Sequence, residues 1–211
     1  MNARSHVDLM KQRGHAVYNQ TKEFRVDVPP GKSGDWEIKP FTTELNLEYA
    51  RLWRNGREPG LGMFTALRHK GHVIMSDTAA EIADLRRWLY RLQGRVLVTG
   101  LGLGMVVRAL TNIERYLGQI HSITVIEKSP DVFKLVAPHY KHSRVEIIND
   151  DAYTWKPKKG SHFDSAWHDI WPTICGDNLE EMKRLRIHYR SYITAGQQFC
   201  WAEAECEELR D

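Results

Sequence analysis

The feature that most constrains the fold of this chain is a glycine-rich segment near its middle. Residues 94–104 read GRVLVTGLGLG, so a short apolar run leads directly into Gly100, Gly102 and Gly104. Apolar residues at helical spacing follow at once, as in an amphipathic helix. A strand, a glycine turn and a helix in this order favour a nucleoside-like ligand, because glycine permits close approach and a helix N-terminus offers free N–H groups.

The spacing of these glycines restricts the kind of ligand. The dinucleotide pattern G-x-G-x-x-G/A needs a small residue five positions after its first glycine. Counted from Gly100 that position is Met105, and counted from Gly102 it is Val107, so neither frame matches. An ordinary glycine-rich turn between a strand and a helix stays the alternative to a ligand site.

Length and cysteine content indicate a small protein from a reducing compartment. At 211 residues the chain fits one domain with a smaller N-terminal extension. Its three cysteines include no C-x-x-C pair, which favours a cytoplasmic location and argues against zinc. The histidines join no recognised ligand motif, so we expect no metal. We expect no signal peptide and no membrane association, since no apolar run approaches roughly 18 residues.

The charge pattern argues against nucleic acid as a partner. The formal net charge is only +3, and the basic residues are scattered in short clusters. A nucleic-acid-binding face is usually more strongly basic than this. We therefore expect a small-molecule substrate.

Residues 1–93 give the weaker patterns. We predict a loop at 29–34 (PPGKSG), a short helix at 44–54, and a β-hairpin made of 64–68 and 72–75. Thr78 and Glu81 have the spacing of a capping box, and we expect the helix that follows to end at Gly94. We treat residues 1–93 as an N-terminal extension with a β-hairpin and a helix.

Residues 94–211 alternate between strand and helix patterns. We predict strands at 96–99, 122–127, 144–148, 163–168 and 197–202, with helices at 104–117, after Ser129, and at 177–193. Ser129 and Pro130 are typical of a helix start. The alternation predicts an α/β fold of three layers around a mostly parallel sheet, which binds its ligand beyond the carboxyl ends of the strands.

Several polar residues fall at these strand ends. Glu127 ends the second strand, where an acid accepts hydrogen bonds from ribose hydroxyls, and Lys128 adjoins it. Asp150 and Asp151 follow the third strand, where a carboxylate accepts from the adenine amino group, although aspartate is also common in plain turns. We prefer Asp151 to Asp150 for this role.

The end of the fourth strand is the most unusual segment. It contains Trp167, His168, Asp169 and Trp171 within five residues. Asp169 is our candidate for a general base, and His168 is a second catalytic candidate because histidine titrates near neutral pH. Trp167 and Trp171 are candidates for excluding water or stacking on a substrate, with a place in the core as the alternative for Trp167 and His168.

Taken together, VLVTGLGLG, Ile126-Glu127, Asn149-Asp150-Asp151-Ala152 and FDSAWHDIWP resemble the class I, Rossmann-like methyltransferases that use S-adenosylmethionine. The resemblance covers about residues 94–203. It implies a Rossmann-like domain with S-adenosylmethionine as cofactor, bound at Gly100, Gly102 and Gly104. It also implies an adenine contact from Asp151-Ala152, which match the "D-A" pair of the family.

Within that superfamily the chain is most similar to spermidine-synthase-like proteins, which carry an N-terminal β-hairpin and an aspartate at the position of Asp169. Three functions stay open: methyl transfer to a small molecule or an amine, aminopropyl transfer with Asp169, Asp177 and Glu81 as substrate-binding acids, and non-catalytic nucleoside binding. Val98 stands where many methyltransferases have an acid. The usual sixth and seventh strands have no room, so we expect the N-terminal segment or a second chain, as in a homo-oligomer, to complete the sheet.

Overall fold

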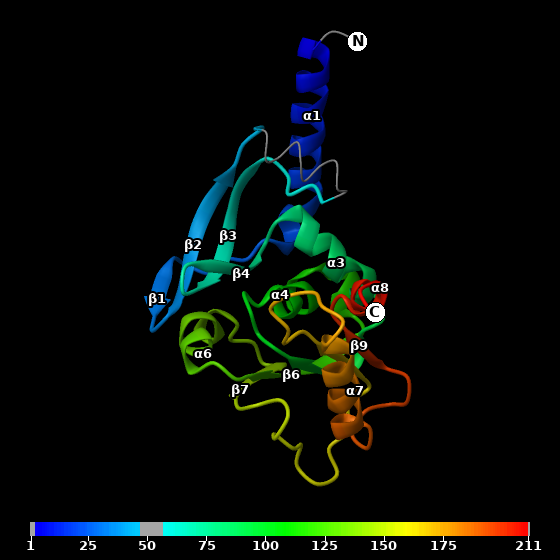
Figure 1. The fold of residues 1–211 in the computed structure, drawn as a ribbon. Coiled ribbons are helices and arrows are strands. Elements are labelled where there is room, and N and C mark those ends of the chain that lie inside the picture. The colour runs from blue at the N-terminus through cyan, green and yellow to red at the C-terminus, as the bar shows by residue number, and fades with distance from the viewer. Residues whose placement is uncertain (1–2, 47–56, 211) are drawn as a thin grey trace.

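The protein folds around a five-stranded parallel sheet, with a second, antiparallel sheet formed by its N-terminal part (Figure 1). These coordinates come from a computed structural model that describes residues 3–46 and 57–210. The parallel sheet has the order β7-β6-β5-β8-β9, and this is the order of a Rossmann-like domain in which the first strand lies at the centre. The predicted α/β class is confirmed. The strands are β5 (Gly94–Thr99), β6 (Ile120–Glu127), β7 (Val145–Asn149), β8 (Ser165–His168) and β9 (Gln198–Cys200).

The central strand β5 fixes the position of the site. All of its residues except Arg95 are buried, as expected for a parallel strand covered on both faces. Thr99 at its end pairs in register with Ile126 of β6 and His168 of β8. The carboxyl ends of these three strands therefore meet at one edge, where the glycine turn begins.

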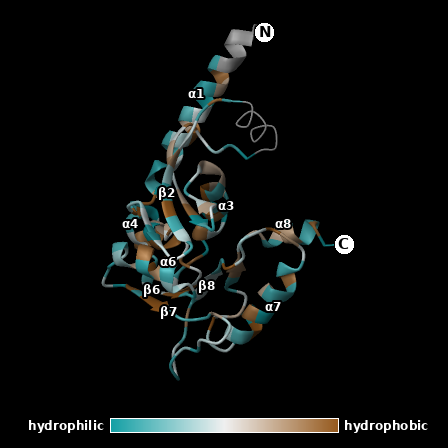
Figure 2. Ribbon diagram, turned by 60° about the vertical axis from the view of Figure 1, so that its left-hand side comes forward, coloured by the Kyte–Doolittle hydropathy of each residue, from teal (hydrophilic) through white to brown (hydrophobic). Residues whose placement is uncertain are grey.

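Helices cover the two faces of the sheet unequally. On one face, Val96 and Val98 pack into a core shared with α3 (Ala79–Leu89), α4 (Met105–Asn112), α5 (Glu114–Leu117) and α6 (Pro130–Val136). On the other face, Leu97 packs with α7 (Asn178–Tyr189) and with Cys206 of α8 (Glu203–Glu208). The apolar colour in Figure 2 gathers on strands such as β7, while α1 is mostly hydrophilic.

The N-terminal region forms its own sheet rather than completing the parallel one. Its order is β1 (Gly31–Ser33), β2 (Trp36–Thr43), β3 (Gly62–His69) and β4 (His72–Ser76), and every pair is antiparallel. The predicted hairpin is confirmed as β3–β4. The loop predicted at 29–34 is wrong, because Gly31–Ser33 pair with β2 and the turn lies at Gly34.

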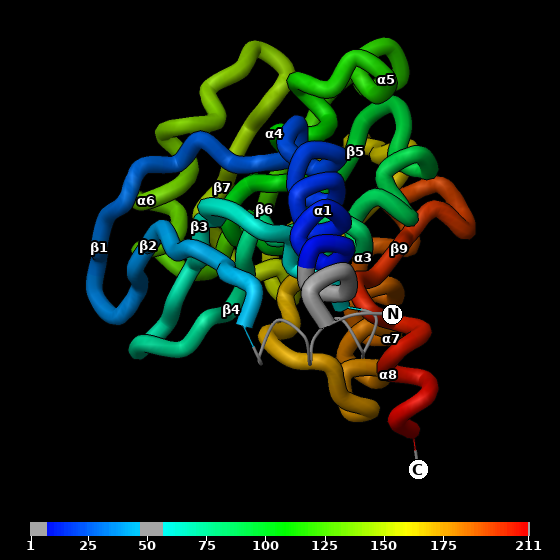
Figure 3. Tube along the Cα trace, turned by 90° about the horizontal axis from the view of Figure 1, so that it is seen from above, coloured from blue at the N-terminus to red at the C-terminus, as the bar shows by residue number. Residues whose placement is uncertain are grey.

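The chain begins with a helix that stands away from the body. This helix, α1 (Ala3–Thr21), is followed by the short 3-10 helix η1 (Lys22–Phe24). Viewed from above, α1 stands between the antiparallel sheet on one side and α7 and α8 on the other (Figure 3). None of the helices in the described ranges is long and apolar enough to cross a membrane.

The antiparallel sheet lies against the carboxyl edge of the parallel one. Its edge strand β1 packs on α6, and the Ser33 hydroxyl donates a hydrogen bond to the Asp131 carboxylate at 2.7 Å. Its other edge strand, β4, leads through Asp77 and Thr78 directly into α3. The second sheet therefore spans from one side of the glycine turn to the other.

The far edge of the parallel sheet is closed by a side chain. The Arg186 guanidinium on α7 donates to the Gln198 carbonyl at 3.2 Å, and the Gln198 amide donates back to the Arg186 carbonyl at 3.2 Å. Arg186 is held in turn by the Glu203 carboxylate, with one contact at 2.6 Å. Neither the N-terminal segment nor another strand of the described chain extends the sheet beyond β9.

Several local predictions need correction. The helix predicted at 104–117 is interrupted at Ile113, whose backbone is extended at φ −91° and ψ 115°. The helix expected to end at Gly94 ends at Leu89, α7 stops at Tyr189, and β9 is shorter than predicted because α8 follows. The Ser129 cap is confirmed, since its hydroxyl accepts from the Val132 N–H. Most of the helix predicted at 44–54 lies outside the described residues.

The predicted capping box at the start of α3 is wrong. Thr78 is the N-cap residue, but its side chain makes no capping hydrogen bond. The Glu81 carboxylate turns instead to Ser76 and accepts from its N–H at 2.9 Å and from its hydroxyl at 2.7 Å. The Glu81 carboxylate therefore binds Ser76, two residues before the N-cap, and not the backbone N–H of the cap residue as the capping-box pattern predicts.

Candidate functional site

The glycine turn between β5 and α4 is the centre of the candidate site. Gly100, Gly102 and Gly104 have φ angles of 91°, 52° and 78°, which are open to glycine at little cost. The Gly100 N–H donates to the Ile126 carbonyl at 2.8 Å, which ties the start of the turn to β6. A Cβ atom on Gly100 would overlap with the Asp169 carbonyl oxygen, so the segment after β8 packs directly on the turn.

Glu127 holds the turn from the side of β6. Its carboxylate accepts from the Leu101 N–H at 2.9 Å and from the Ser129 N–H at 2.7 Å. The side chain is 8% exposed, and burial raises its pKa, which the hydrogen bonds from backbone N–H groups oppose. An acid is thus placed at the turn as predicted, but here its oxygens bind the protein's own backbone.

The residues after β7 form a more exposed acidic position. The Asp151 carboxylate pairs with the Lys128 ammonium at 2.8 Å and accepts from the Tyr153 N–H at 2.9 Å. The hydrogen bond from Lys128 is the main reason that the pKa of Asp151 lies below its ordinary value. The Asp150 carboxylate accepts from the Asp151 N–H at 2.7 Å, while Ala152 is buried and its carbonyl accepts from the Tyr189 hydroxyl.

His168 lies inside the domain and not at a surface. It is 0% exposed, with Nδ1 3.0 Å from the Thr99 hydroxyl and Nε2 3.1 Å from the Gln198 amide oxygen. Burial lowers the pKa of His168 to about 4, and this geometry corresponds to the alternative of an interior histidine rather than to a group that titrates near neutral pH. The ring is a hydrogen-bonded core residue that links β5, β8 and β9.

The two tryptophans are also core residues. Trp167 is 1% exposed and packs in the core on the α3 and α4 side, so it cannot stack on a substrate in this arrangement. Trp171 is 5% exposed and donates its indole N–H to the Glu181 carboxylate at 2.8 Å. Trp167 thus has the core place that was its alternative, and the two indoles belong to separate buried clusters on opposite faces of the sheet.

Asp169 lies at the expected strand end, half-buried beside the glycine turn. Its N–H donates to the Thr99 carbonyl at 2.9 Å, which fixes the backbone beside the glycine turn. Burial, together with the neighbouring charge of Glu81, raises the pKa of Asp169 to about 7. Burial also raises the pKa of Glu81 to about 7, although hydrogen bonds from Ser76 oppose this. Asp169 and Glu81 therefore both have raised pKa values, and the charge of Glu81 contributes to the shift at Asp169.

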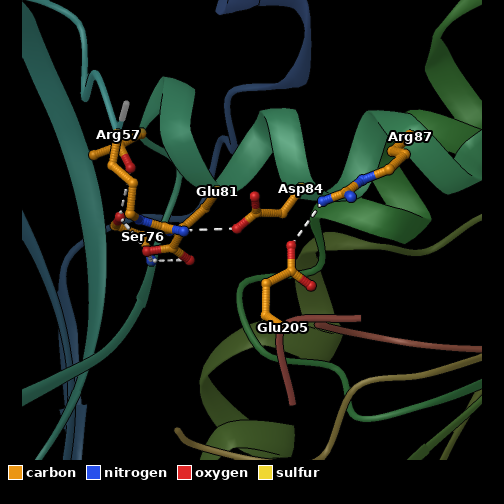
Figure 4. Close-up of polar contacts among 7 residues, drawn as sticks. Arg57, Ser76, Glu81, Asp84, Arg87 and Glu205 are labelled. Carbon is orange, nitrogen blue, oxygen red and sulfur yellow. Dashed lines mark hydrogen bonds and ion pairs between the residues drawn. The ribbon is translucent and has the colours of Figure 1, made fainter. Parts of the chain in front are cut away.

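Further charged side chains lie near Glu81, at Arg57 and on α3 and α8 (Figure 4). Asp84 pairs with Arg57 at 3.3 Å, and Arg87 pairs with Glu205 at 2.9 Å. Asp84 adds its charge to those that raise the pKa of Asp169. Sequence reasoning had selected Glu81 for this region but not Asp84 or Glu205, and Asp177, its third acid, lies at the N-cap of α7.

Two residues that the sequence did not single out contact the glycine turn. The Met75 sulfur accepts from the Leu103 N–H at 3.1 Å, and the Tyr140 hydroxyl donates to the Leu103 carbonyl at 2.7 Å. Cβ atoms on Gly102 and Gly104 would overlap with Met75 and Tyr140, respectively. Because these positions are glycines, neighbouring groups can come closer to the backbone of the turn than they could if it carried side chains. A cofactor that binds against the turn needs the same close approach.

Together these residues fit a nucleoside cofactor with an amino-acid tail. The turn presents backbone N–H groups at the start of α4, Glu127 ends β6, and Asp151 follows β7 at the same edge. Met75 and Tyr140 approach the turn with side-chain atoms, which can move. Among the described residues, no group of three or more histidine, cysteine or acidic side chains is arranged to hold a metal ion.

No family model matches the sequence, and no curated protein matches it. Solved structures that resemble the chain include TrmN from Thermus thermophilus, with a TM-score of 0.44 and 12% identity over 72% of this chain and 48% of that chain. The N-methyltransferase NodS from Bradyrhizobium japonicum WM9, in complex with S-adenosyl-L-homocysteine, matches with a TM-score of 0.43 and 13% identity, over 61% of this chain and 65% of that chain. The CcbJ methyltransferase from Streptomyces caelestis matches with a TM-score of 0.41 and 15% identity, over 56% of this chain and 47% of that chain.

The matched part is thus less than two thirds of each of these three solved chains. All three TM-scores are below 0.5, so the Rossmann-like assignment rests on the strand order of the chain itself.

Proposed function

We propose that the chain is a methyltransferase that uses S-adenosylmethionine and acts on a small molecule with an amine as the accepting group. The observation that carries this proposal is the position of Asp169. It follows β8 directly, its backbone packs on Gly100, and its carboxyl group has a pKa raised to about 7. A base with a pKa near the working pH is the kind that proton transfer requires.

The chain's own residues divide the work in this proposal. The glycine turn and Glu127 hold the cofactor, with Asp151 and Ala152 at its adenine and Lys128 beside them. Asp169 accepts a proton from the accepting amine, and desolvation together with the charge of Glu81 keeps the pKa of that carboxyl group in a useful range. Asp84 and Glu205 add acidic groups nearby, each paired with an arginine that a cationic substrate would replace.

The bound cofactor would supply an activated methyl group on a sulfonium. Transfer from a sulfonium is a direct displacement, so the protein contributes by positioning, by excluding water and by removing a proton. His168 has no part in this scheme, since it is buried and hydrogen-bonded on both ring nitrogens.

Binding measurements test the cofactor first. Calorimetry with S-adenosylmethionine, S-adenosylhomocysteine and NAD should give binding of the first two and not of NAD. Tighter binding of NAD than of S-adenosylhomocysteine would contradict the proposal.

Incubation with labelled cofactor and a pooled small-molecule extract then separates the reactions. Methylated product supports methyl transfer, whereas labelled S-adenosylmethionine recovered unchanged, with binding intact, would point to a nucleoside-binding protein without activity.

Aminopropyl transfer is the second candidate, and the resemblance to spermidine-synthase-like proteins belongs with it. The group of Glu81, Asp84, Asp169 and Glu205 favours it, because a polyamine needs several acids along its length. Incubation with decarboxylated S-adenosylmethionine would then release a thioadenosine product, which methyl transfer does not give.

A cytoplasmic, reducing location is part of the proposal as well. The three cysteines Cys175, Cys200 and Cys206 are free thiols. A reducing compartment would keep them so.

A further inference from the structure

The side chain of Met75 lies on the glycine turn at Gly102. Met75 is near the end of β4, and its sulfur accepts the Leu103 N–H at 3.1 Å. A Cβ atom on Gly102 would overlap with the same sulfur atom. The thioether thus occupies the space that Gly102 leaves open and also accepts the N–H group of Leu103.

Two neighbouring polar groups of the turn are also bound by side chains. Glu127 accepts the Leu101 N–H, and the Tyr140 hydroxyl donates to the Leu103 carbonyl. Of these contacts, the one from Met75 is the weakest by chemistry, because a thioether sulfur is a poor acceptor. A ligand carboxylate would be a much stronger acceptor for the same N–H.

A second contact keeps Met75 in this place. The next residue, Ser76, is 4% exposed and donates its N–H and its hydroxyl to the Glu81 carboxylate on α3 (Figure 4). These hydrogen bonds fasten the end of β4 to α3, so the backbone of Met75 cannot drift from the turn. The side chain itself stays mobile, because methionine has three rotatable bonds and adapts its shape readily.

We propose that Met75 is a gate over the cofactor turn, held in position by Ser76 and Glu81, and that a ligand enters when the side chain rotates away from Leu103. This proposal rests on the proposed function, since it takes the turn to be the cofactor site. The antiparallel sheet then regulates cofactor binding, and its fourth strand sets the fraction of molecules that are open. The apparent affinity is reduced by that fraction.

The test is the affinity of S-adenosylhomocysteine for three proteins, measured by calorimetry. Met75→Ala removes the gate, and we expect binding about two- to tenfold tighter than in the wild type. Met75→Leu keeps an apolar side chain of similar size but lacks the sulfur acceptor, so it should shift the affinity in the same direction. Met63→Ala is the matched control on β3, where Met63 is 65% exposed, and it should bind as the wild type does.

A readout without ligand tests the contact separately. In Met75→Ala the Leu103 N–H loses its acceptor, so its hydrogen exchange should become faster, while exchange at Leu101 stays as in the wild type. If Met75→Ala does not fold, both the affinity and the hydrogen exchange are measured on Met75→Leu, and its results decide the test.

The two proposals fail in different ways. Equal or weaker binding of S-adenosylhomocysteine to folded Met75→Ala, with clear binding to the wild type, would overturn the gate and leave the cofactor site intact. Absence of binding to the wild type and to both Met75 variants would overturn the proposed function and the gate together.

Discussion

Asp151 and Asp169 are two aspartates in nearly the same place in the fold, yet their surroundings drive them in opposite directions. Each follows a strand of the parallel sheet, β7 for Asp151 and β8 for Asp169. Asp151 is paired with the exposed Lys128, which lowers its pKa, whereas desolvation of the half-buried Asp169 and the charge of Glu81 raise the pKa of Asp169 to about 7. Groups whose environments push their pKa values apart divide into binding and proton-transfer roles. The position at a strand end therefore does not set the pKa of either aspartate, because the surrounding side chains and the degree of burial do.

The largest effect is expected from removing the charge of Asp169. Asp169→Asn should lower turnover by about 10²–10⁴-fold, because the amide cannot accept a proton, while the affinity for S-adenosylhomocysteine stays nearly unchanged. Steady-state kinetics and calorimetry on the same preparation measure both. Asp177→Asn is the control, since Asp177 lies at the N-cap of α7 without a capping hydrogen bond. If loss of folding stability accounted for the whole loss of turnover, Asp169 would be a structural residue.

Glu127→Ala tests whether the acid at the end of β6 contributes to cofactor binding. The substitution frees the Leu101 and Ser129 N–H groups and removes the acid at the ribose position. The affinity for S-adenosylhomocysteine should fall by about 10–100-fold, as expected for one or two hydrogen bonds to a charged group. Calorimetry measures it, with Glu146→Ala on β7 as a control. An unchanged affinity would mean that Glu127 serves the turn and not the ligand.

The pH dependence of stability should separate Asp169 from Asp151 without any substrate. A carboxyl group whose pKa is raised by folding stabilises the protein below its ordinary pKa, and this contribution is lost as the pH rises towards about 7. The free energy of unfolding of Asp169→Asn, measured in urea, should therefore rise relative to that of the wild type as the pH increases from the ordinary pKa of 3.8 to about 7, and should change no further above that. The opposing contribution of His168, whose pKa is lowered to about 4, is common to both proteins. A difference independent of pH would argue against a raised pKa.

The smallest effect is expected at Lys128, on the exposed side. Lys128→Met removes the partner of Asp151, so the pKa of Asp151 should rise towards its ordinary value, as followed by NMR titration. The Lys128 side chain is 76% exposed, and an exposed ion pair contributes at most about 1 kcal/mol to the free energy of unfolding. A large destabilisation would show that the pair is more than a surface contact.

The frame of the parallel sheet could be predicted because each strand is bounded by its own signal. The glycines end β5, and Ser129 with Pro130 starts α6. Once these strands are taken as parallel, Glu127, Asp151 and Asp169 must lie at one edge. The gathering of the candidate acids therefore followed from the topology and needed no side-chain detail.

What the sequence could not give are contacts made across the two sheets. Met75 lies on Gly102 from a different sheet, and nothing in its own neighbourhood marks it. The spacing of Thr78 and Glu81 predicts a capping box, but the N–H and the hydroxyl of Ser76 both donate to the Glu81 carboxylate instead. All four residues of β8 are buried, so alternation could not tell that Trp167 and His168 lie inside.

The closed edge at β9 has a consequence for association between copies of the chain. An exposed edge strand offers unpaired backbone groups to any other strand, and proteins avoid this by covering or charging the edge. Here the outward carbonyl of Gln198 is taken by Arg186, which Glu203 holds in turn. An incoming strand would first have to displace a paired guanidinium, so sheet-to-sheet aggregation at this end is opposed by charge.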